Sequence, residues 1–382
     1  MPTRNGIAFF CLTALLLIAG IVLNYTPVIL VASGMIACLV VAVIWLGLRP
    51  DLQVRRQVVP ARVTEGEAAN GVLHVTNSGK RRCPPLVATE STPNGYLGIS
   101  LPGLHSGATY DTTYRIPTDR RGCYKIGPLR VGYADPLRLI NVSKTDGYES
   151  LLWVHPRIYK VKPIPTSYSQ EAEGPTSLGA PRGGITFHSL RDYVPGDDPR
   201  LIHWRSTART GHLMVRHTVV TNEPRLLIVL DTSARSYLRE SFEEAVRVAA
   251  SLIMAGADQR FPTDFRTTGG ISGSIDPAGA GRIDVLDKLA SVKVSDDDPG
   301  LRALIRIGTV RDRGMSLGVV TGRPSRERAK GLASVRNRFQ TVTMVQIGEA
   351  SGGRPPISLS GVLAVNASTS EEWVHKWKAV VG

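Results

Sequence analysis

The sequence predicts three structural parts in succession: an N-terminal hairpin of two transmembrane helices, a small all-β sandwich, and an α/β doubly wound domain. Three observations predict them. Residues 1–50 contain two apolar runs without a charged residue inside either run. Residues 51–162 consist of short alternating segments separated by Gly, Pro, Asn and Ser. From residue 225 to 382, strand-like apolar runs alternate with segments of helical periodicity, and residues 163–224 form the connection.

The N-terminal part is predicted to be a membrane hairpin. Apolar runs cover residues 7–23 and 28–48, and a four-residue Asn-Tyr-Thr-Pro break separates them. About 20 apolar residues span the hydrocarbon core, so the second run is long enough and the first is at the short end. A cleaved signal peptide is the alternative for the first run, but the second span follows at once, which favours a hairpin. Because Arg4 precedes the hairpin, Arg49 follows it and the break contains no Lys or Arg, the positive-inside rule predicts a multi-pass protein of the inner (plasma) membrane with a cytoplasmic large domain.

The chain is strongly basic. It carries 46 Lys and Arg against 32 Asp and Glu, a formal charge of +14 over 382 residues. This excess favours partners with acidic surfaces, namely anionic lipid headgroups, nucleic acid or an acidic protein, and does not choose among them.

Cysteine is scarce in this sequence. Cys11 and Cys38 lie in the apolar runs, and Cys83 and Cys123 lie far apart in the β-rich part. The chain has no CxxC pair and no Cys/His cluster, which argues against a structural zinc site. The pattern fits a reduced cytosolic compartment and leaves a Cys83–Cys123 bridge open.

Residues 51–162 are expected to form a small antiparallel β-sandwich. Segments 71–75 and 110–116 alternate in polarity, and no long helical period appears. The basic run Lys80-Arg81-Arg82 follows an Asn-Ser-Gly turn and is expected to be a solvated hairpin tip; a lipid-facing role is the alternative. Residues 168–184, rich in Ser, Gly and Pro, are expected to be a linker or irregular loop.

The C-terminal part alternates between strands and helices. Residues 226–230 are continuously apolar, as in a strand buried on both faces, and residues 240–257 follow with helical spacing. Ser368 and Glu371 stand at the spacing of a capping box. The remaining predicted elements are helices at 283–292, 301–307, 325–339 and 368–381 and strands at 315–321, 341–347 and 362–366. This alternation predicts a mostly parallel sheet that binds ligands beyond the carboxyl ends of its strands, where Asp231 lies.

The densest cluster of unusual chemistry is residues 190–216. It combines a Pro-Gly-Asp-Asp-Pro turn, a His-Trp-Arg triplet and several arginines. The candidate residues of this signature segment, structural or partner-binding, are Arg191, Tyr193, Pro195, Gly196, Asp197, Arg200, His203, Trp204 and Arg209.

A family resemblance rests on this segment. The spacing R-x-Y-x-P-G-D-x-x-R-x-I-x-W, followed by S-x-A-R and a strand that ends in Asp, resembles the bacterial membrane proteins of the domain of unknown function 58 family. The resemblance extends to the R-G-x-Y-x-x-G-P-L run at 121–129 and to Asp-Pro-Leu at 135–137, although Arg138 stands where the family often has Gly. It implies a von Willebrand factor A-like domain. It also implies, by resemblance alone, a MoxR-type AAA+ ATPase as partner in an assembly role at the cell envelope.

The acidic and basic residues of the signature segment have competing interpretations. Asp197 and Asp198 could be paired catalytic carboxylates, but their place between Gly and Pro favours turn stabilisation. Arginine forks suit fixed pairs with carboxylates, so an internal charge network that holds the segment against the sheet is favoured over an anion or acidic-partner site. The candidate members of this network are Arg191, Arg200 and Arg209 with Asp192, Asp197 or Asp231. Trp204 is expected to be a buried anchor.

No catalytic constellation emerges. The histidines at 188, 203, 212 and 217 lack the usual metal-ligand spacing, except that His212 and His217 are five apart within a predicted strand or loop. Ser189 and Ser206 lack a G-x-S-x-G context. No P-loop motif is present, so the chain is expected not to be an enzyme.

The end of the strand at 226–230 resembles the D-x-S-x-S metal motif of von Willebrand factor A-type domains. Asp231 and Ser233 would offer hard oxygen ligands to Mg²⁺. However, Arg235 occupies the third motif position, and the turn at 321–323 carries Arg323 where an acidic residue is expected. A degenerate site without a cofactor, in which Asp231 caps a loop or pairs with an arginine, is therefore favoured over a magnesium site.

These observations predict a membrane-anchored, non-enzymatic adaptor or scaffold whose cytoplasmic A-like domain binds a protein partner. One alternative is an A-domain binding module that depends on magnesium. Another is nucleic-acid binding through the basic segment around Trp204, against which the interleaved aspartates argue.

Overall fold

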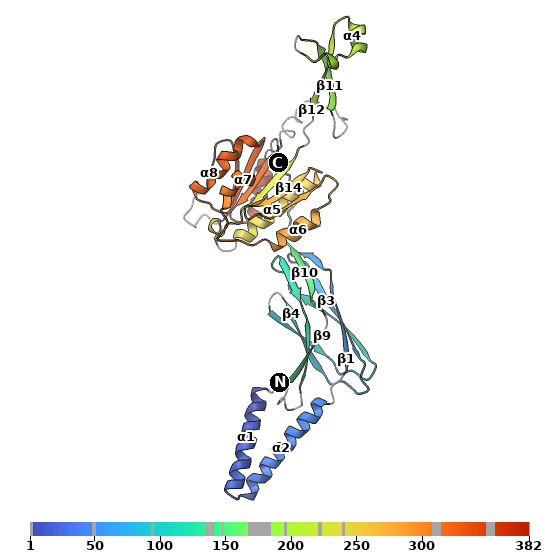
Figure 1. The fold of residues 1–382 in the computed structure, drawn as a ribbon, viewed down its shortest axis with the longest axis vertical. Helices are drawn as coiled ribbons and strands as arrows, with labels where there is room; N and C mark the ends of the chain where they lie inside the picture. Colours follow the sequence, from blue (N-terminus) through green and yellow to red (C-terminus); the bar gives the residue numbers. More distant parts are fainter. Residues whose placement is uncertain are drawn as a thin grey trace. The chain divides into compact units, whose positions relative to one another are not determined.

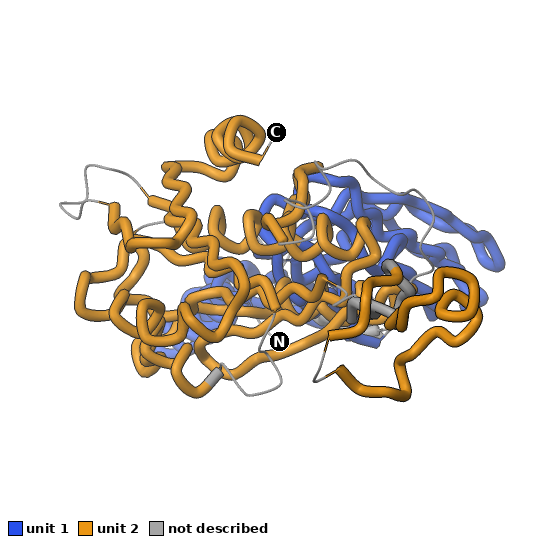
Figure 2. Tube along the Cα trace, turned by 90° about the horizontal axis from the view of Figure 1, so that it is seen from above, with its two compact units in different colours: residues 1–155 blue, residues 156–382 orange. Residues whose placement is uncertain are grey.

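The structure is a computed structural model of the 382-residue chain. It describes residues 3–47, 51–92, 95–134, 137, 139, 141–146, 148–166, 185–194, 197–220, 224–238, 241–307, 315–348 and 356–381. The chain forms two compact units, Met1–His155 and Pro156–Gly382 (Figure 2).

The first unit begins with two antiparallel helices, α1 (Arg4–Val22) and α2 (Thr26–Gly47) (Figure 1). Both are long and apolar enough to cross a membrane. Gly20 allows the helices to approach closely, because a Cβ there would lie 2.9 Å from Ile29 Cγ1. Asn24, with φ of 50°, makes the tight turn between them. The predicted apolar hairpin is therefore present, although the first turn of α2 includes the proline that was expected in the break.

The rest of the first unit is built from β-sheets that are antiparallel except for one pair, β2–β10. One sheet has the order β1 (Leu52–Val59), β3 (Ala69–Asn77), β6 (Thr109–Ile116). A second has the order β5 (Gly95–Leu101), β4 (Leu86–Thr92), β8 (Leu129–Ala134), β9 (Asn141–Asp146). A third has the order β2 (Arg62–Thr64), β10 (Ser150–His155), β7 (Gly122–Ile126).

Alternation along the strands places one side of each sheet inside. β3 alternates strictly between buried and half-buried residues, with Leu73 and Val75 fully buried. A buried ion pair joins Arg56 of β1 to Glu90 of β4. Cys83 and Cys123 are both free thiols, so the bridge that the sequence left open is not formed in the structure.

The second unit contains a six-stranded sheet of order β15-β14-β13-β16-β17-β18, parallel except for β15. This is the order of a doubly wound sheet with an antiparallel edge strand. The strands are β13 (Leu226–Leu230), β14 (Thr263–Thr267), β15 (Ser272–Ile275), β16 (Ser316–Thr321), β17 (Thr341–Ile347) and β18 (Leu363–Ala367). The helices are α5 (Ser241–Asp258), α6 (Arg282–Ser291), α7 (Leu304–Ile307), α8 (Arg326–Val335) and α9 (Ser370–Val381), with 3₁₀ turns η2 (Ala234–Ser236), η3 (Gly300–Ala303) and η5 (Arg336–Arg338).

Both faces of this sheet are covered. Leu226, Ile228 and Leu230 pack with α5, α6 and α9 in one core, whereas Leu227 and Val229 pack with α7 and α8 in the other. The completely apolar sequence of β13 follows from this double burial, as predicted.

Several details differ from the sequence prediction. Strands β14 and β15 were not predicted, because residues 263–275 are polar and glycine-rich. The capping of α9 is shifted by one residue from the predicted pair. Thr369 Oγ1 accepts from the Glu372 amide (3.2 Å), and Glu372 accepts from the Ser368 amide (2.7 Å).

The second unit also contains a two-stranded sheet, β11 (Ile185–Asp192) with β12 (Met214–Val220). Between these strands the chain forms η1 (Pro199–Leu201) and α4 (Trp204–Thr210), so α4 lies at the tip of the hairpin (Figure 1). We call residues 185–220 the signature hairpin, since they contain the signature segment.

Candidate functional site

The signature hairpin is held together by its own backbone. The Tyr193 amide donates to Leu213 O (2.8 Å), and the His203 amide donates to Met214 O (2.7 Å). Val215, which pairs with Arg191 across the hairpin, is buried. These contacts bring the chain that leaves β11 back onto β12 and fix the tip.

The acidic residues of the tip stabilise turns. Arg191 donates to both carboxylate oxygens of Asp197, at 2.8 and 2.5 Å, and the Val194 amide donates to the same carboxylate (3.0 Å). The Asp198 carboxylate accepts from the Arg200 amide (2.9 Å). Turn stabilisation by both aspartates, as predicted, is therefore what the structure shows; Pro195 and Gly196 lie outside the described residues.

This ion pair has an electrostatic signature. The hydrogen bond from Arg191 and the amide of Val194 hold the pKa of the Asp197 carboxyl below its ordinary value, and the Asp197 carboxylate raises the pKa of Arg191. The predicted charge network extends no further. Arg200 and Arg209 make no ion pair with any part of the chain that the structure describes.

His203 is the N-cap of α4. Its ring accepts from the Ser206 amide (3.3 Å), and the Ser206 hydroxyl lies 2.8 Å from the same ring nitrogen. Gly211, with φ of 77°, ends the helix in the left-handed conformation. The His203–Ser206 contact belongs to this cap; within the described ranges no carboxylate contacts His203, so the pair lacks the third group of a catalytic triad.

Trp204 is 67% exposed, and the prediction of a buried anchor is wrong. The reason is local: α4 has only seven residues, and none of them is buried. Three further apolar side chains of the tip are also exposed, namely Val194, Leu201 and Leu213. The tip therefore presents an aromatic side chain and aliphatic neighbours together with unpaired arginines.

A second group of polar residues lies where β13 and β16 end. The Asp231 carboxylate is fully buried and accepts from the Ser233 amide (3.0 Å) and from the Thr321 hydroxyl (2.7 Å). Tyr237 donates its hydroxyl hydrogen bond to Asp231 O (2.6 Å). Because the order of the sheet reverses between β13 and β16, this position is the topological switch point at which such sheets bind ligands.

Asp298 joins this strand-end cluster, and the sequence prediction missed it. Its carboxylate accepts from the Thr268 hydroxyl (2.7 Å) and from the Thr232 hydroxyl. Gly300 has φ of 63°, and a Cβ there would lie 3.3 Å from the Asp231 carboxylate, so a glycine is needed for the loop to approach. The triple Asp run at 296–298 was the available signal, but spacing alone does not bring that loop to Asp231.

The predicted alternative that Asp231 pairs with an arginine is wrong. Arg235 is exposed, and Ser236, buried, is the residue that lies beside Asp231. Arg323 donates to Gly348 O (2.8 Å), and no arginine is among the partners of Asp231 in the described chain. Asp231 accepts a hydrogen bond from the amide of Ser233 in its own loop, which confirms the predicted role as a loop cap.

Burial governs the ionisation of the cluster. It raises the pKa of Asp231, and the nearby Asp298 adds to that increase, while the hydrogen bond from Thr321 opposes it. Burial and the two carboxylates also raise the pKa of Tyr237. The hydroxyl of Ser233, completely buried, has no hydrogen-bond partner among the residues that the structure describes.

A cleft of about 470 Å³ opens beside the cluster. Asp298, Thr268 and Arg306 are among the residues that line it. Across the residues with a defined position, no group of three or more His, Cys, Asp or Glu gathers as a metal site, so a cation here would have to rely on two carboxylates and hydroxyls.

Comparison with known proteins supports the resemblance to one family. The family model described as protein of unknown function DUF58 matches residues 189–299. The uncharacterized protein YeaD of Bacillus subtilis is 23% identical over 217 residues, which are 53% of this chain and 52% of YeaD. The chain thus spans about half the length of that relative. The match to this family, whose function is unknown, covers the signature segment, in agreement with the resemblance in the sequence.

Solved structures offer only distant similarity. A CARDB domain from Pyrococcus furiosus is 17% identical, with a TM-score of 0.23 over 28% of this chain and 93% of that chain. The C-terminal domain of wzt is 14% identical, with a TM-score of 0.23 over 29% of this chain and 77% of that chain.

Proposed function

We propose that this protein is a membrane-anchored, non-enzymatic adaptor that binds a protein partner through the tip of its signature hairpin. The observation that carries the proposal is the 67% exposure of Trp204 within the family's matched segment. Exposed tryptophan with aliphatic and arginine neighbours is the composition of a protein-binding hot spot. The helices α1 and α2 would anchor the chain, with both ends of the hairpin in the cytoplasm.

The partner we propose is a MoxR-type AAA+ ATPase, which the family resemblance implies. We further propose that the α/β domain is von Willebrand factor A-like, a fold that presents binding surfaces at the carboxyl ends of its strands. The strand order β15-β14-β13-β16-β17-β18 and the helices on both faces support this proposal.

The test is an affinity pulldown of the full chain from detergent-solubilised membranes under ATP-trapped conditions. We expect the AAA+ ATPase to be recovered, and Trp204→Ala to reduce recovery about 30-fold, the effect of removing a 2 kcal/mol hot spot. Ile283→Ala, which removes a similarly exposed aliphatic side chain from α6, is the control and should change nothing. Failure to recover any AAA+ ATPase would reject the partner.

The arginines of the tip that make no ion pair with the described residues could also bind nucleic acid. The same purified chain is therefore tested for binding to single-stranded DNA. We expect no gel shift at low salt. A shift that weakens steeply with salt would replace the adaptor with a nucleic-acid-binding protein.

A magnesium-dependent binding module is the second candidate, favoured by the unpartnered Ser233 hydroxyl beside Asp231. A divalent cation held by Asp231 and Asp298 would offset two nearby buried negative charges and give this hydroxyl a partner. Calorimetry of the full chain with Mg²⁺ and Mn²⁺ tests it. The candidate predicts heat that Asp231→Ala abolishes; absence of heat with the folded wild-type chain rejects it.

A further inference from the structure

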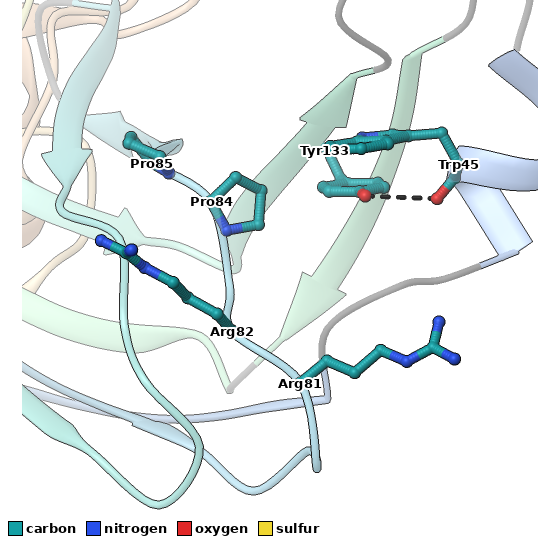
Figure 3. A pocket seen from close by; sticks show the side chains of 6 residues that line it. All are labelled: Trp45, Arg81, Arg82, Pro84, Pro85 and Tyr133. Carbon is teal, nitrogen blue, oxygen red and sulfur yellow. Dashed lines mark hydrogen bonds between the residues drawn. The ribbon is translucent and has the colours of Figure 1, made fainter. Parts of the chain in front are cut away.

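The first unit contains a cavity of about 410 Å³ beside the last turn of α2 (Figure 3). Its lining residues are Trp45, Arg81, Arg82, Pro84, Pro85 and Tyr133. We call it the basic cavity. Its size is within the range of small-molecule sites, and its walls combine aromatic and proline rings with two guanidinium groups.

The basic cavity lies where a transmembrane α2 would leave the bilayer. Trp45 is two residues before the end of α2, and the Tyr133 hydroxyl of β8 donates to Trp45 O (3.2 Å) (Figure 3). At the other end of the hairpin, Thr3 donates twice to Leu139 O, each time at 3.0 Å. Both ends of the hairpin are thus tied to the sandwich, which holds the cavity at the level of the headgroups if the helices span the membrane.

The charges of the cavity are unbalanced. Arg81 and Arg82 are exposed, and neither side chain makes a hydrogen bond or ion pair with the residues that the structure places. No Asp or Glu is among the lining residues. Their side chains leave adjacent positions on the loop in opposite directions, so the two guanidinium groups lie on different sides of the cavity (Figure 3).

The loop that carries these arginines is held in place. Asn77 is fully buried, and its amide donates to Arg81 O (2.8 Å), Leu104 O (3.1 Å) and His105 O (3.2 Å). Cys83 exchanges two backbone hydrogen bonds with Leu104 (2.8 and 3.0 Å). A hairpin tip that served only for solubility would not need a buried asparagine beneath it, and this support lowers the entropy lost when a ligand binds.

We propose that the basic cavity binds the phosphodiester headgroup of an anionic phospholipid. Arginine forks match phosphate oxygens in a bidentate manner, and Trp and Tyr favour the boundary between apolar chains and water. The inference rests on the proposed membrane anchoring. It goes beyond anchoring, because it assigns lipid selectivity to named residues outside the helices.

The test uses the full chain in nanodiscs of phosphatidylcholine mixed with phosphatidylglycerol, with the lipid retained after extraction measured by native mass spectrometry. We expect the wild-type chain to retain phosphatidylglycerol preferentially. Arg81→Ala/Arg82→Ala should lower that preference about 30-fold, since each basic residue near an anionic surface contributes a factor of about 5.4. Arg115→Ala/Arg130→Ala removes the same charge from exposed strand positions outside the cavity and should leave the preference within about twofold.

Each contrary outcome has a distinct meaning. An equal loss in both double variants would show a general effect of charge and overturn the site. Unchanged retention in Arg81→Ala/Arg82→Ala would do the same. Full competition by inorganic phosphate would show a site for the free anion and overturn the lipid assignment. A chain that fails to enter nanodiscs would reject the membrane anchor itself, which separates the two failures.

Discussion

At the scale of single residues, charged groups in this protein act mainly on nearby backbone. Asp197 receives both nitrogens of Arg191 and the Val194 amide, so one carboxylate fixes the turn after β11. Asp231 receives the Ser233 amide in the same manner at the end of β13. The difference is burial: Asp197 is near water and its pKa is lowered, whereas Asp231 is enclosed and its pKa is raised.

The lowered pKa of Asp197 predicts how the turn depends on pH. Its unfolded pKa is about 3.8, and Arg191 lowers the folded value. The stabilisation is therefore complete above 3.8 and is lost as the pH falls through the lowered folded pKa. We expect the hydrogen-exchange protection factor of the Val194 amide to be constant near neutrality and to fall only below that range. In Asp197→Asn it should be low at every pH; full protection in that variant would contradict the role of the ion pair.

The residues that sequence reasoning placed wrongly share a physical cause. Trp204 was expected inside because large aromatic side chains usually are, but α4 is a seven-residue helix at a hairpin tip and none of its residues is buried. Asp298 was missed because a loop of polar residues gives no periodic signal. The position of Asp298 close to Asp231 depends on the fold of the connection after α6. Asp197 was placed correctly because a turn is decided by residues that are neighbours in sequence.

At the scale of elements, a regular apolar pattern over a long segment was enough to predict the helix or strand from the sequence. The two apolar helices, the buried strand β13 and the amphipathic helix α5 all lie where the pattern predicted them. Strands β14 and β15 were not predicted, because most of their residues are polar or glycine and give no apolar pattern in the sequence. The short helix α4 depends instead on its caps, His203 and Gly211.

This dependence gives a prediction for α4. His203→Ala removes the acceptor of the Ser206 amide and should destabilise the helix by about 1 kcal/mol. Because isolated short helices are marginal in water, we expect faster exchange of the amides of residues 204–210 and weaker binding of any partner that contacts Trp204. His212→Ala, an exposed histidine of the same hairpin that caps no helix, is the control. Equal exchange in both variants would show that the cap is dispensable.

At the scale of the whole molecule, the chain joins an apolar helical hairpin, long enough to cross a membrane, to two differently built folded parts. The positive charges near the hairpin bear on its orientation: Arg4 is the first residue of α1, and the basic loop with Arg81 and Arg82 lies in the β-rich part of the same unit. A cytoplasmic sandwich would bring this loop to the anionic inner leaflet. Membrane orientation is therefore the property on which both the adaptor and the lipid proposals depend.

Cysteine labelling measures that orientation without engineered sites. Cys11 and Cys38 lie within α1 and α2, and Cys83 is buried, which raises the pKa of its thiol and makes it unreactive. Cys123 is exposed on β7. With both ends of the hairpin in the cytoplasm, a membrane-impermeant maleimide should label the chain in inside-out vesicles but not in intact spheroplasts. Cys123→Ser should abolish the labelling. If the chain were labelled in spheroplasts and Cys123→Ser removed that labelling, the sandwich would lie outside the cell. This result would reverse the predicted topology.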